Sequence, residues 1–394
     1  MSEGEFLAFR GEYFLFQYDL SPYIICWIFT CLFAYLASKS KSNTMKFMFS
    51  LLTILIPSIM AGIRASTVGI DIGSYALPHF NRARNSLSFI EYISTNGSPS
   101  LNEIGWHALT YISTKTFDSL NWNFFFYNFF TCTFFYVGAW KHRKFASLPL
   151  IMLVFFLMQY NLTYNLMRQA IACSIIFMGF DNLEKRKYLK FFIYIIAASC
   201  FHASALFAVV FMLGFQFAIA EDFGKVRGFV DILLCSLILL CFVVAPILQV
   251  ILLYITPLSK YAGMARSGSQ GYHTVGIMLI GEFMLFLFYP KGGRNIFKRS
   301  PGGEIMFYYY RYSIAFGIAF YWGARFMPRA YFYFEYVNIL AYSVLHRFVR
   351  DKYLRFIVLM ITMASLFAYF YKYFVINNRE HCGSFPYVTI FETL

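Results

Sequence analysis

Charged residues are scarce in this chain. They make up 13% of its 394 residues, whereas hydrophobic residues make up 59%. A soluble domain carries about 25% charged residues, because its surface must be hydrated. The sequence therefore lacks the polar surface that a soluble protein of this length needs, and we expect the chain to lie largely in lipid. Aromatic residues reach 22%, which suits that environment, since Tyr and Trp favour membrane interfaces and Phe packs between helices.

Other patterns are missing as well. The eight cysteines include no CxxC pair and lie mostly in apolar runs, so neither a disulfide framework nor a metal site is indicated. The first residues are acidic and lack the basic start of a cleavable signal peptide, so we expect the first span to be retained. A net charge of +14 would suggest nucleic acid for a soluble protein. Here the Lys and Arg lie between apolar runs without any nucleic-acid motif, so no nucleic-acid partner is expected.

Long apolar runs dominate the chain instead. A helix that crosses a bilayer needs about 20 mostly apolar residues, and by that measure we count about twelve spans. Two of the longest apolar stretches are interrupted in the middle, one by Asn165 and Arg168 and the other by His202. We expect a tight hairpin at each interruption, with its bend below the membrane surface. The predicted spans are 21–38, 45–63, 122–140, 147–162, 164–180, 188–202, 204–220, 229–250, 274–290, 305–323, 330–346 and 354–374.

Positive charge sets the predicted orientation. With the N-terminus outside, every inside loop is basic, as the positive-inside rule requires. The inside set is Lys39, Lys41, Lys46, Lys141, Arg143, Lys144, Lys185, Arg186, Lys187, Lys190, Lys225, Arg227, Lys291, Arg294, Lys298, Arg299, Arg347, Arg350, Lys352 and Arg355. Residues 64–121 then form a long outside loop, and loops of that length are often functional. We predict an all-α, polytopic membrane helix bundle of about twelve transmembrane helices, forming a single domain over residues 1–394.

Arginines on the outside are the first candidates for function, because an ionisable group at membrane depth costs about 2.5–3.5 kcal/mol. Arg168 lies at the start of an apolar helix, where free N–H groups also favour an anion. The alternative is an Arg paired with a buried carboxylate. Arg325 and Arg329 are four residues apart and could hold one anion on a helix face. Pro328 could instead place them on either side of a bend, and both could be ordinary interfacial arginines.

Candidate bases lie on the same side. His202 could act as a general base, because imidazole exchanges protons near neutral pH, or it could be a packing residue. Asp71 and Glu103 could each deprotonate a hydroxyl group. Equally, Asp71 could hold Arg64 in a salt bridge. We expect Trp106, in the same loop, to anchor it at the membrane interface.

Three blocks of the sequence resemble the EpsG family, which is related to the Wzy-type O-antigen polymerases. The blocks are spread through most of the chain, and the middle one is the most specific. They are Arg64 to Tyr75 with Phe80; then Asn165, Arg168, Gln169 and Ala172 followed by Ala198, His202, Ser204 and Ala205; and finally Arg325, Arg329 and Tyr331-Phe332-Tyr333.

The resemblance implies an enzyme of the bacterial cytoplasmic membrane that joins oligosaccharide repeat units into O-antigen or exopolysaccharide at the periplasmic face. A chain on undecaprenyl pyrophosphate is the implied donor, and one lipid-linked unit is the acceptor. The enzyme would be a metal-independent glycosyltransferase without a cofactor. Its implied partners are the lipid-linked oligosaccharide and membrane lipid. Whether a chain-length regulator also binds is left open by the sequence.

Roles for the candidate residues follow from this hypothesis. Pyrophosphate-binding residues would be Arg64, Arg168, Arg325 and Arg329. The proton from the attacking hydroxyl would go to His202, Asp71 or Glu103. Substrate-binding residues would be Tyr75, Asn165 and Gln169.

Other functions remain open from sequence. An O-antigen ligase or a single-sugar lipid-phosphate glycosyltransferase could use the same outward arginines, and a membrane acyltransferase could have a similar number of spans. A flippase for the same lipid is the alternative from a different class. It needs a charged cavity through the bilayer, whereas the unusual charges here concentrate at one face. We see no internal repeat of the kind found in many transporters.

Overall fold

The computed structural model describes residues 19–95, 98–99, 102–209, 212, 289–311, 313, 327–376 and 382–392. Within these ranges the regular structure is helical, apart from a short hairpin in which β1 (Ser94–Thr95) pairs antiparallel with β2 (Ser98–Pro99) and a single bridge between Arg64 and Thr389. Residues 382–392 form no helix. The prediction of an all-α bundle is confirmed for this part of the chain. The predicted span 229–250 and most of the spans 204–220, 274–290 and 305–323 lie outside the described residues, as do Lys225, Arg227 and Arg325.

The bundle is built from helices of different lengths. Its α-helices are α2 (Ser21–Lys39), α3 (Asn43–Gly62), α7 (Leu120–Lys141), α8 (Leu148–Met158), α9 (Met167–Glu184), α10 (Tyr188–Ser199), α17 (Met327–Tyr342) and α18 (Lys352–Phe370). Shorter turns of 3-10 or π-helix are η3 (Tyr160–Tyr164), η4 (Ala203–Ala208), η5 (Leu345–Phe348) and η6 (Tyr371–Ile376).

Three of these segments are long and apolar enough to cross a membrane, namely α2, α3 and Lys352–Ile376. They match the predicted spans 21–38, 45–63 and 354–374. Length and composition therefore support a membrane protein, while the count of about twelve spans stays a prediction.

Both interrupted apolar stretches break where their polar residues lie. Helix α8 ends at Met158, and α9 begins only at Met167. Similarly, α10 ends at Ser199, and η4 begins at Ala203, just after His202. The two interruptions expected from the sequence are therefore present, and each places a polar segment between helix ends, while the hairpin topology stays a prediction.

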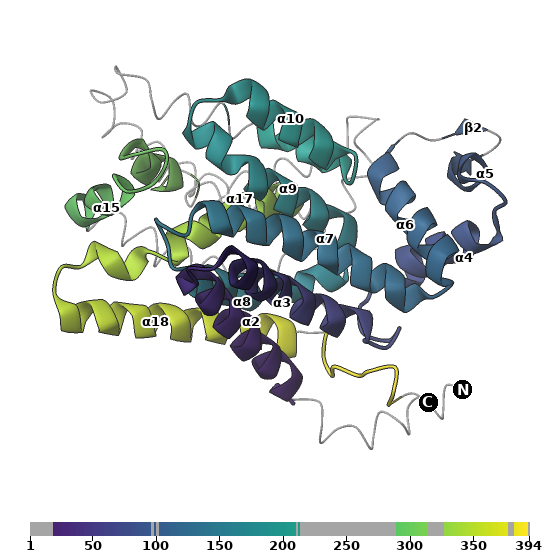
Figure 1. Ribbon diagram of the computed structural model, residues 1–394, viewed down its shortest axis with the longest axis horizontal. Coiled ribbons are helices and arrows are strands. Elements are labelled where there is room, and N and C mark those ends of the chain that lie inside the picture. The colour runs from purple at the N-terminus through teal and green to yellow at the C-terminus, as the bar shows by residue number, and fades with distance from the viewer. Residues whose placement is uncertain are drawn as a thin grey trace, which may run out of the picture.

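Residues 64–121 fold into a small helical layer, which we call the cap. It contains the π-helix η2 (Ile72–Ala76) and the α-helices α4 (Leu77–Asn85), α5 (Phe89–Ile93) and α6 (Ile104–Phe117). Its own small core includes Ala83, Tyr92 and Ile93. Figure 1 shows α4, α5 and α6 gathered at one end of the bundle. The segment predicted as a long loop thus contains helices that pack on a core of their own.

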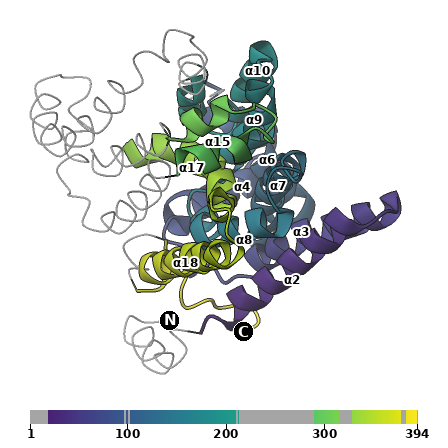
Figure 2. The same cartoon turned by 90° about the vertical axis from the view of Figure 1, so that its left-hand side faces the viewer.

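Basic segments meet at the other end of the bundle, where Figure 1 shows α15 (Pro290–Phe297) and from which Figure 2 views the molecule. The Arg347 Nη1 atom donates to the carbonyl of Phe145 at 2.8 Å. The Phe297 ring packs between the rings of Phe145 and Phe348, with centroids at 5.2 and 6.1 Å. This contact brings together three connections that the positive-inside rule places on one side.

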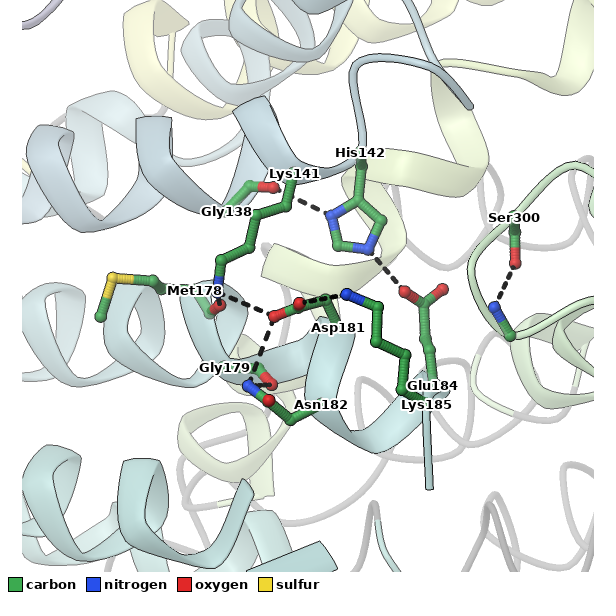
Figure 3. Close-up of polar contacts among 11 residues, drawn as sticks. Gly138, Lys141, His142, Met178, Gly179, Asp181, Asn182, Glu184, Lys185 and Ser300 are labelled. Atoms are coloured by element: carbon green, nitrogen blue, oxygen red, sulfur yellow. Dashed lines mark hydrogen bonds and ion pairs between the residues drawn. The ribbon is translucent and has the colours of Figure 1, made fainter. Parts of the chain in front are cut away.

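A buried ion pair joins two helices at this basic end (Figure 3). His142, just after α7, donates its Nδ1–H to the carbonyl of Gly138 at 2.9 Å, and its Nε2 lies 2.7 Å from Oε2 of Glu184 in α9. The two side chains are 0% and 1% exposed. Burial lowers the pKa of His142, but the charge and hydrogen bond of Glu184 raise it further, so that the net pKa lies above the ordinary value.

We predict that Glu184→Gln strongly destabilises the protein, because it leaves the buried imidazole without its charge partner. Removing one member of a buried pair costs about 3–5 kcal/mol. Thermal unfolding in detergent micelles should show a clear drop in the midpoint. The difference from the wild type should be full below a pH of about 6.5 and should shrink as the pH rises through the raised pKa of His142.

The control is Lys185→Gln. Lys185 pairs with Asp181 at 2.9 Å, but its side chain is 47% exposed, so its loss should change stability by less than about 0.5 kcal/mol. Equal midpoints for Glu184→Gln and Lys185→Gln would refute the stabilising role of the buried pair.

Candidate functional site

A pocket opens where the two interruptions meet the cap. It is lined by Asp71, Tyr75, Trp106, Asn165, Leu166, Met167, Arg168, Gln169 and His202. The cap supplies the first three, the start of α9 supplies the middle five, and the bend before η4 supplies His202. The structure therefore brings together the following predicted site residues: Asp71, Tyr75, Asn165, Arg168, Gln169 and His202.

The carboxylate of Glu103 connects these segments. Glu103 precedes α6 in a left-handed conformation, with φ of 54°. Its Oε2 accepts a hydrogen bond from Nη1 of Arg168, and its Oε1 lies 2.5 Å from Nδ1 of His202. The backbone N–H of Ala203 donates to the same Oε1 at 3.4 Å. One side chain of the cap thus fixes both the start of α9 and the bend before η4.

Glu103 is therefore better suited to holding its neighbours than to accepting a proton. Its side chain is 12% exposed. Burial raises its pKa, but the hydrogen bond from His202 and the charge of Arg168 lower it further, so the net pKa lies below the ordinary value. Because both oxygens are occupied and the group stays ionised, we assign Glu103 a positioning role instead of the predicted role as a base.

The contact with Glu103 also sets the tautomer of His202. An ionised carboxylate only accepts hydrogen bonds, so the proton of the imidazole lies on Nδ1. The neutral ring then carries its free lone pair on Nε2. The side chain is 21% exposed at the pocket. His202 thus has the arrangement of a general base that is oriented by a carboxylate.

Arg168 is the second residue of α9, and the pocket is lined by residues 166–169, the first turn of that helix. The first turn of a helix has N–H groups without partners inside the helix, and its dipole favours an anion. The guanidinium also lies over the ring of Tyr75 at 4.9 Å. Only its Nη1 is used by Glu103, so further N–H donors can bind a ligand. This corner of the pocket is suited to a phosphate group.

The Asn165 side chain connects three segments around the pocket by hydrogen bonds. Its Oδ1 accepts hydrogen bonds from the backbone N–H groups of Ile70 and Asp71, at 2.8 and 3.3 Å. Its Nδ2 donates to the carbonyl of Cys382 at 2.6 Å. Asn165 therefore positions Asp71 and connects residues 382–392 to the same end of the bundle. Its side-chain oxygen and nitrogen both have partners within the protein, so Asn165 supports the pocket structurally.

Two predicted residues lie elsewhere than expected. Arg64 is 1% exposed and does not line the pocket. Its guanidinium lies between the rings of Phe124 and Tyr164, at 4.2 and 4.3 Å, and donates to the Tyr164 carbonyl at 3.2 Å. Trp106 is also 1% exposed and packs on Tyr127 with centroids at 4.0 Å, so it is a wall of the pocket and not an interface anchor.

The third predicted block is described in part. Arg325 lies outside the described residues, and Arg329 lies in the first turn of α17. One turn later, the Tyr333 hydroxyl forms a hydrogen bond of 2.9 Å with Oγ of Ser204 in η4. The start of α17 is therefore tied to the bend that carries His202.

Sequence reasoning missed the histidines of the cap. His79 and His107 both form hydrogen bonds with Tyr92, beside Glu103. The available signal was the presence of His79 and His107 within the same predicted outside loop as Asp71 and Glu103. In the described part of the chain, no group of three or more His, Cys, Asp or Glu side chains is arranged to hold a metal ion.

Comparison with known proteins gives one finding. The model of the EpsG family matches residues 46–389. A search of the curated proteins and a search of the solved structures each found no match to the chain.

We predict that Asn165→Asp lowers stability by about 1–3 kcal/mol, because an oxygen then faces the carbonyl of Cys382 in place of a donor. Thermal unfolding in detergent measures the loss. Asn182→Asp serves as the control, since Asn182 donates to the Gly179 carbonyl at 3.1 Å from a partly exposed position. An unchanged midpoint for Asn165→Asp would contradict the supporting role.

Proposed function

Because the chain belongs to the EpsG family, we propose that it polymerises oligosaccharide repeat units carried on undecaprenyl pyrophosphate, by glycosyl transfer at the periplasmic face of the bacterial inner membrane. Family membership supports a membrane polysaccharide polymerase-like function. The finer proposal depends on one observation, which is the Glu103 carboxylate shared by Arg168 and His202 at the edge of a pocket.

The arrangement offers both halves of a glycosyl transfer. Nε2 of His202 takes the proton from a hydroxyl of the acceptor sugar. The hydroxyl oxygen then forms a bond to the anomeric carbon of the donor, and the bond from that carbon to pyrophosphate breaks. Arg168 and the first turn of α9 stabilise the negative charge that develops on the leaving pyrophosphate. A single displacement of this kind inverts the anomeric centre.

The remaining residues receive supporting roles in this proposal. Asp71 and Gln169 line the pocket, where they can hold sugar hydroxyls, and Tyr75 orients the guanidinium of Arg168. Arg329, and Arg325 outside the described residues, remain candidates for a second contact with pyrophosphate. Arg64 would act indirectly, through the packing of Tyr164 below the pocket.

We predict that Arg168→Ala and Arg168→Lys both lose polymerisation by a factor of at least about 100, since one donor to a developing charge contributes about 10²–10³ in rate. Lys keeps the charge but loses the planar set of donors. Purified protein is incubated with undecaprenyl-pyrophosphate-linked repeat units, and the products are separated on a gel. Wild-type protein should give a ladder, and both variants should leave the single unit.

The matched control is Arg84→Gln. Arg84 also lies in the cap, but it is 56% exposed and pairs with Asp118 at 2.8 Å, so its variant should give the full ladder. A full ladder from Arg168→Ala would refute the proposal. Other outcomes identify the alternatives, because movement of the lipid across vesicles without bond formation indicates a flippase. In cells, loss of every capped unit indicates a ligase, and loss of acetylation alone indicates an acyltransferase.

A second prediction separates the two candidate bases. His202→Gln should lower the turnover number by about 10²–10⁴, the usual contribution of a general base. Asp71→Asn should act mainly on the Michaelis constant of the acceptor, because the amide still forms hydrogen bonds. Initial rates at varied acceptor concentration measure both effects. A larger loss of turnover number in Asp71→Asn than in His202→Gln would transfer the role of base to Asp71.

A further inference from the structure

A second polar cluster lies in the cap, beside the pocket. The Tyr92 hydroxyl lies 3.2 Å from Nδ1 of His79 and 3.2 Å from Nδ1 of His107. Nη2 of Arg82 also lies 3.2 Å from Nδ1 of His79. The two imidazole rings are 5.2 Å apart between centroids. These residues come from α4, α5 and α6, so the cluster is built by all three helices of the cap.

The positions of the protons follow from the partners. A guanidinium only donates, so Nδ1 of His79 must accept and the proton of that ring lies on Nε2. The Tyr92 hydroxyl then donates to Nδ1 of His79 and accepts from Nδ1–H of His107. In this assignment Nδ1 of His79 shares its lone pair between the two donors, Arg82 and Tyr92. His79 is left with an N–H group at Nε2, and His107 is left with a lone pair at Nε2.

Both rings stay neutral near neutral pH. Burial, the neighbouring His107 and the charge of Arg82 lower the pKa of His79 to about 4. Burial also lowers the pKa of His107, although Glu103 opposes the shift. The cluster therefore offers a fixed pair of hydrogen-bonding groups, one donor and one acceptor.

The cluster is packed against the cap and lies close to Glu103, the residue that holds the proposed base. Tyr92 is 1% exposed and belongs to the small core of the cap. His107 lies one helical turn after Glu103, whose carboxylate holds His202. Both histidines are partly exposed, and neither Nε2 has a hydrogen-bond partner in the part of the chain that the structure describes. Neither histidine lines the pocket itself, but both lie close enough to Glu103 and Arg168 for those charges to shift their pKa values.

We propose that His79 and His107 form a subsite that binds hydroxyl groups of the acceptor sugar and orients it toward His202. This inference rests on the proposed function and deepens it. Neighbouring sugar hydroxyls each donate and accept, so two of them match one N–H group and one lone pair. Among the described residues, no third His, Cys, Asp or Glu side chain is placed with His79 and His107 to hold a metal ion.

The test uses a glycan without its lipid. Its probe is the oligosaccharide released by mild acid from the lipid-linked units that accumulate in cells lacking this protein. Binding to the purified full-length protein in detergent is measured by calorimetry. His107→Leu should weaken binding about tenfold, which corresponds to about 1.4 kcal/mol. His107→Gln should stay within about threefold of the wild type, because the amide restores a polar group near the Nε2 position.

Binding of undecaprenyl pyrophosphate alone is measured for the same variants and should be unchanged. Arg84→Gln is the control for the cap. Equal oligosaccharide binding by the wild type, His107→Leu and His107→Gln would overturn the subsite, as would a parallel loss of pyrophosphate binding in His107→Leu. If the wild type binds the oligosaccharide but forms no polymer, the subsite stands and the polymerase proposal fails. If the wild type forms polymer without binding the oligosaccharide, the polymerase proposal stands and the subsite proposal fails.

Discussion

The Glu103 carboxylate is the contact on which the site depends, because one side chain joins three segments that are far apart in the sequence. It bonds with Arg168 and His202, which lie 65 and 99 residues further along the chain. A partly buried cation near lipid is costly unless it is paired. Glu103 compensates Arg168 and at the same time fixes the proton of His202 on Nδ1. The same carboxylate therefore stabilises the partly buried cation and sets the tautomer of the proposed base.

The membrane explains where such a contact can form. Backbone groups inside a bilayer must be satisfied internally, so a span cannot open in the middle unless protein surrounds the break. The break around Asn165 contacts the cap and residues 382–392, and the break at His202 contacts Glu103 of the cap. Asn165 satisfies the N–H groups of Ile70 and Asp71 and the carbonyl of Cys382. The cap is therefore needed for the breaks to exist as well as for the pocket they form.

Hydropathy and charge predicted much of this arrangement. Long apolar runs located α2, α3 and α18, and polar interruptions located both breaks, because these signals are local in the sequence. The partners of each polar side chain could not be predicted in this way. Arg64 and Arg168 look alike in sequence, yet one lies buried between two aromatic rings and the other faces the pocket. Glu103 looked like a base, and only its two partners reveal a positioning role.

The ion pairs at the two ends of the bundle differ in burial and in the hydrogen-bonding groups that they leave available. At the basic end, the His142–Glu184 pair is fully buried, and both ring nitrogens of His142 are occupied, one by Glu184 and the other by the Gly138 carbonyl. At the pocket end, Arg168 and His202 are 29% and 21% exposed, and each has further hydrogen-bonding capacity beyond Glu103. A carboxylate with a lowered pKa can hold two cationic or polar partners without accepting their protons. In the proposed reaction, that property would let the pocket receive an anionic leaving group on one side and a hydroxyl proton on the other, with Glu103 ionised throughout.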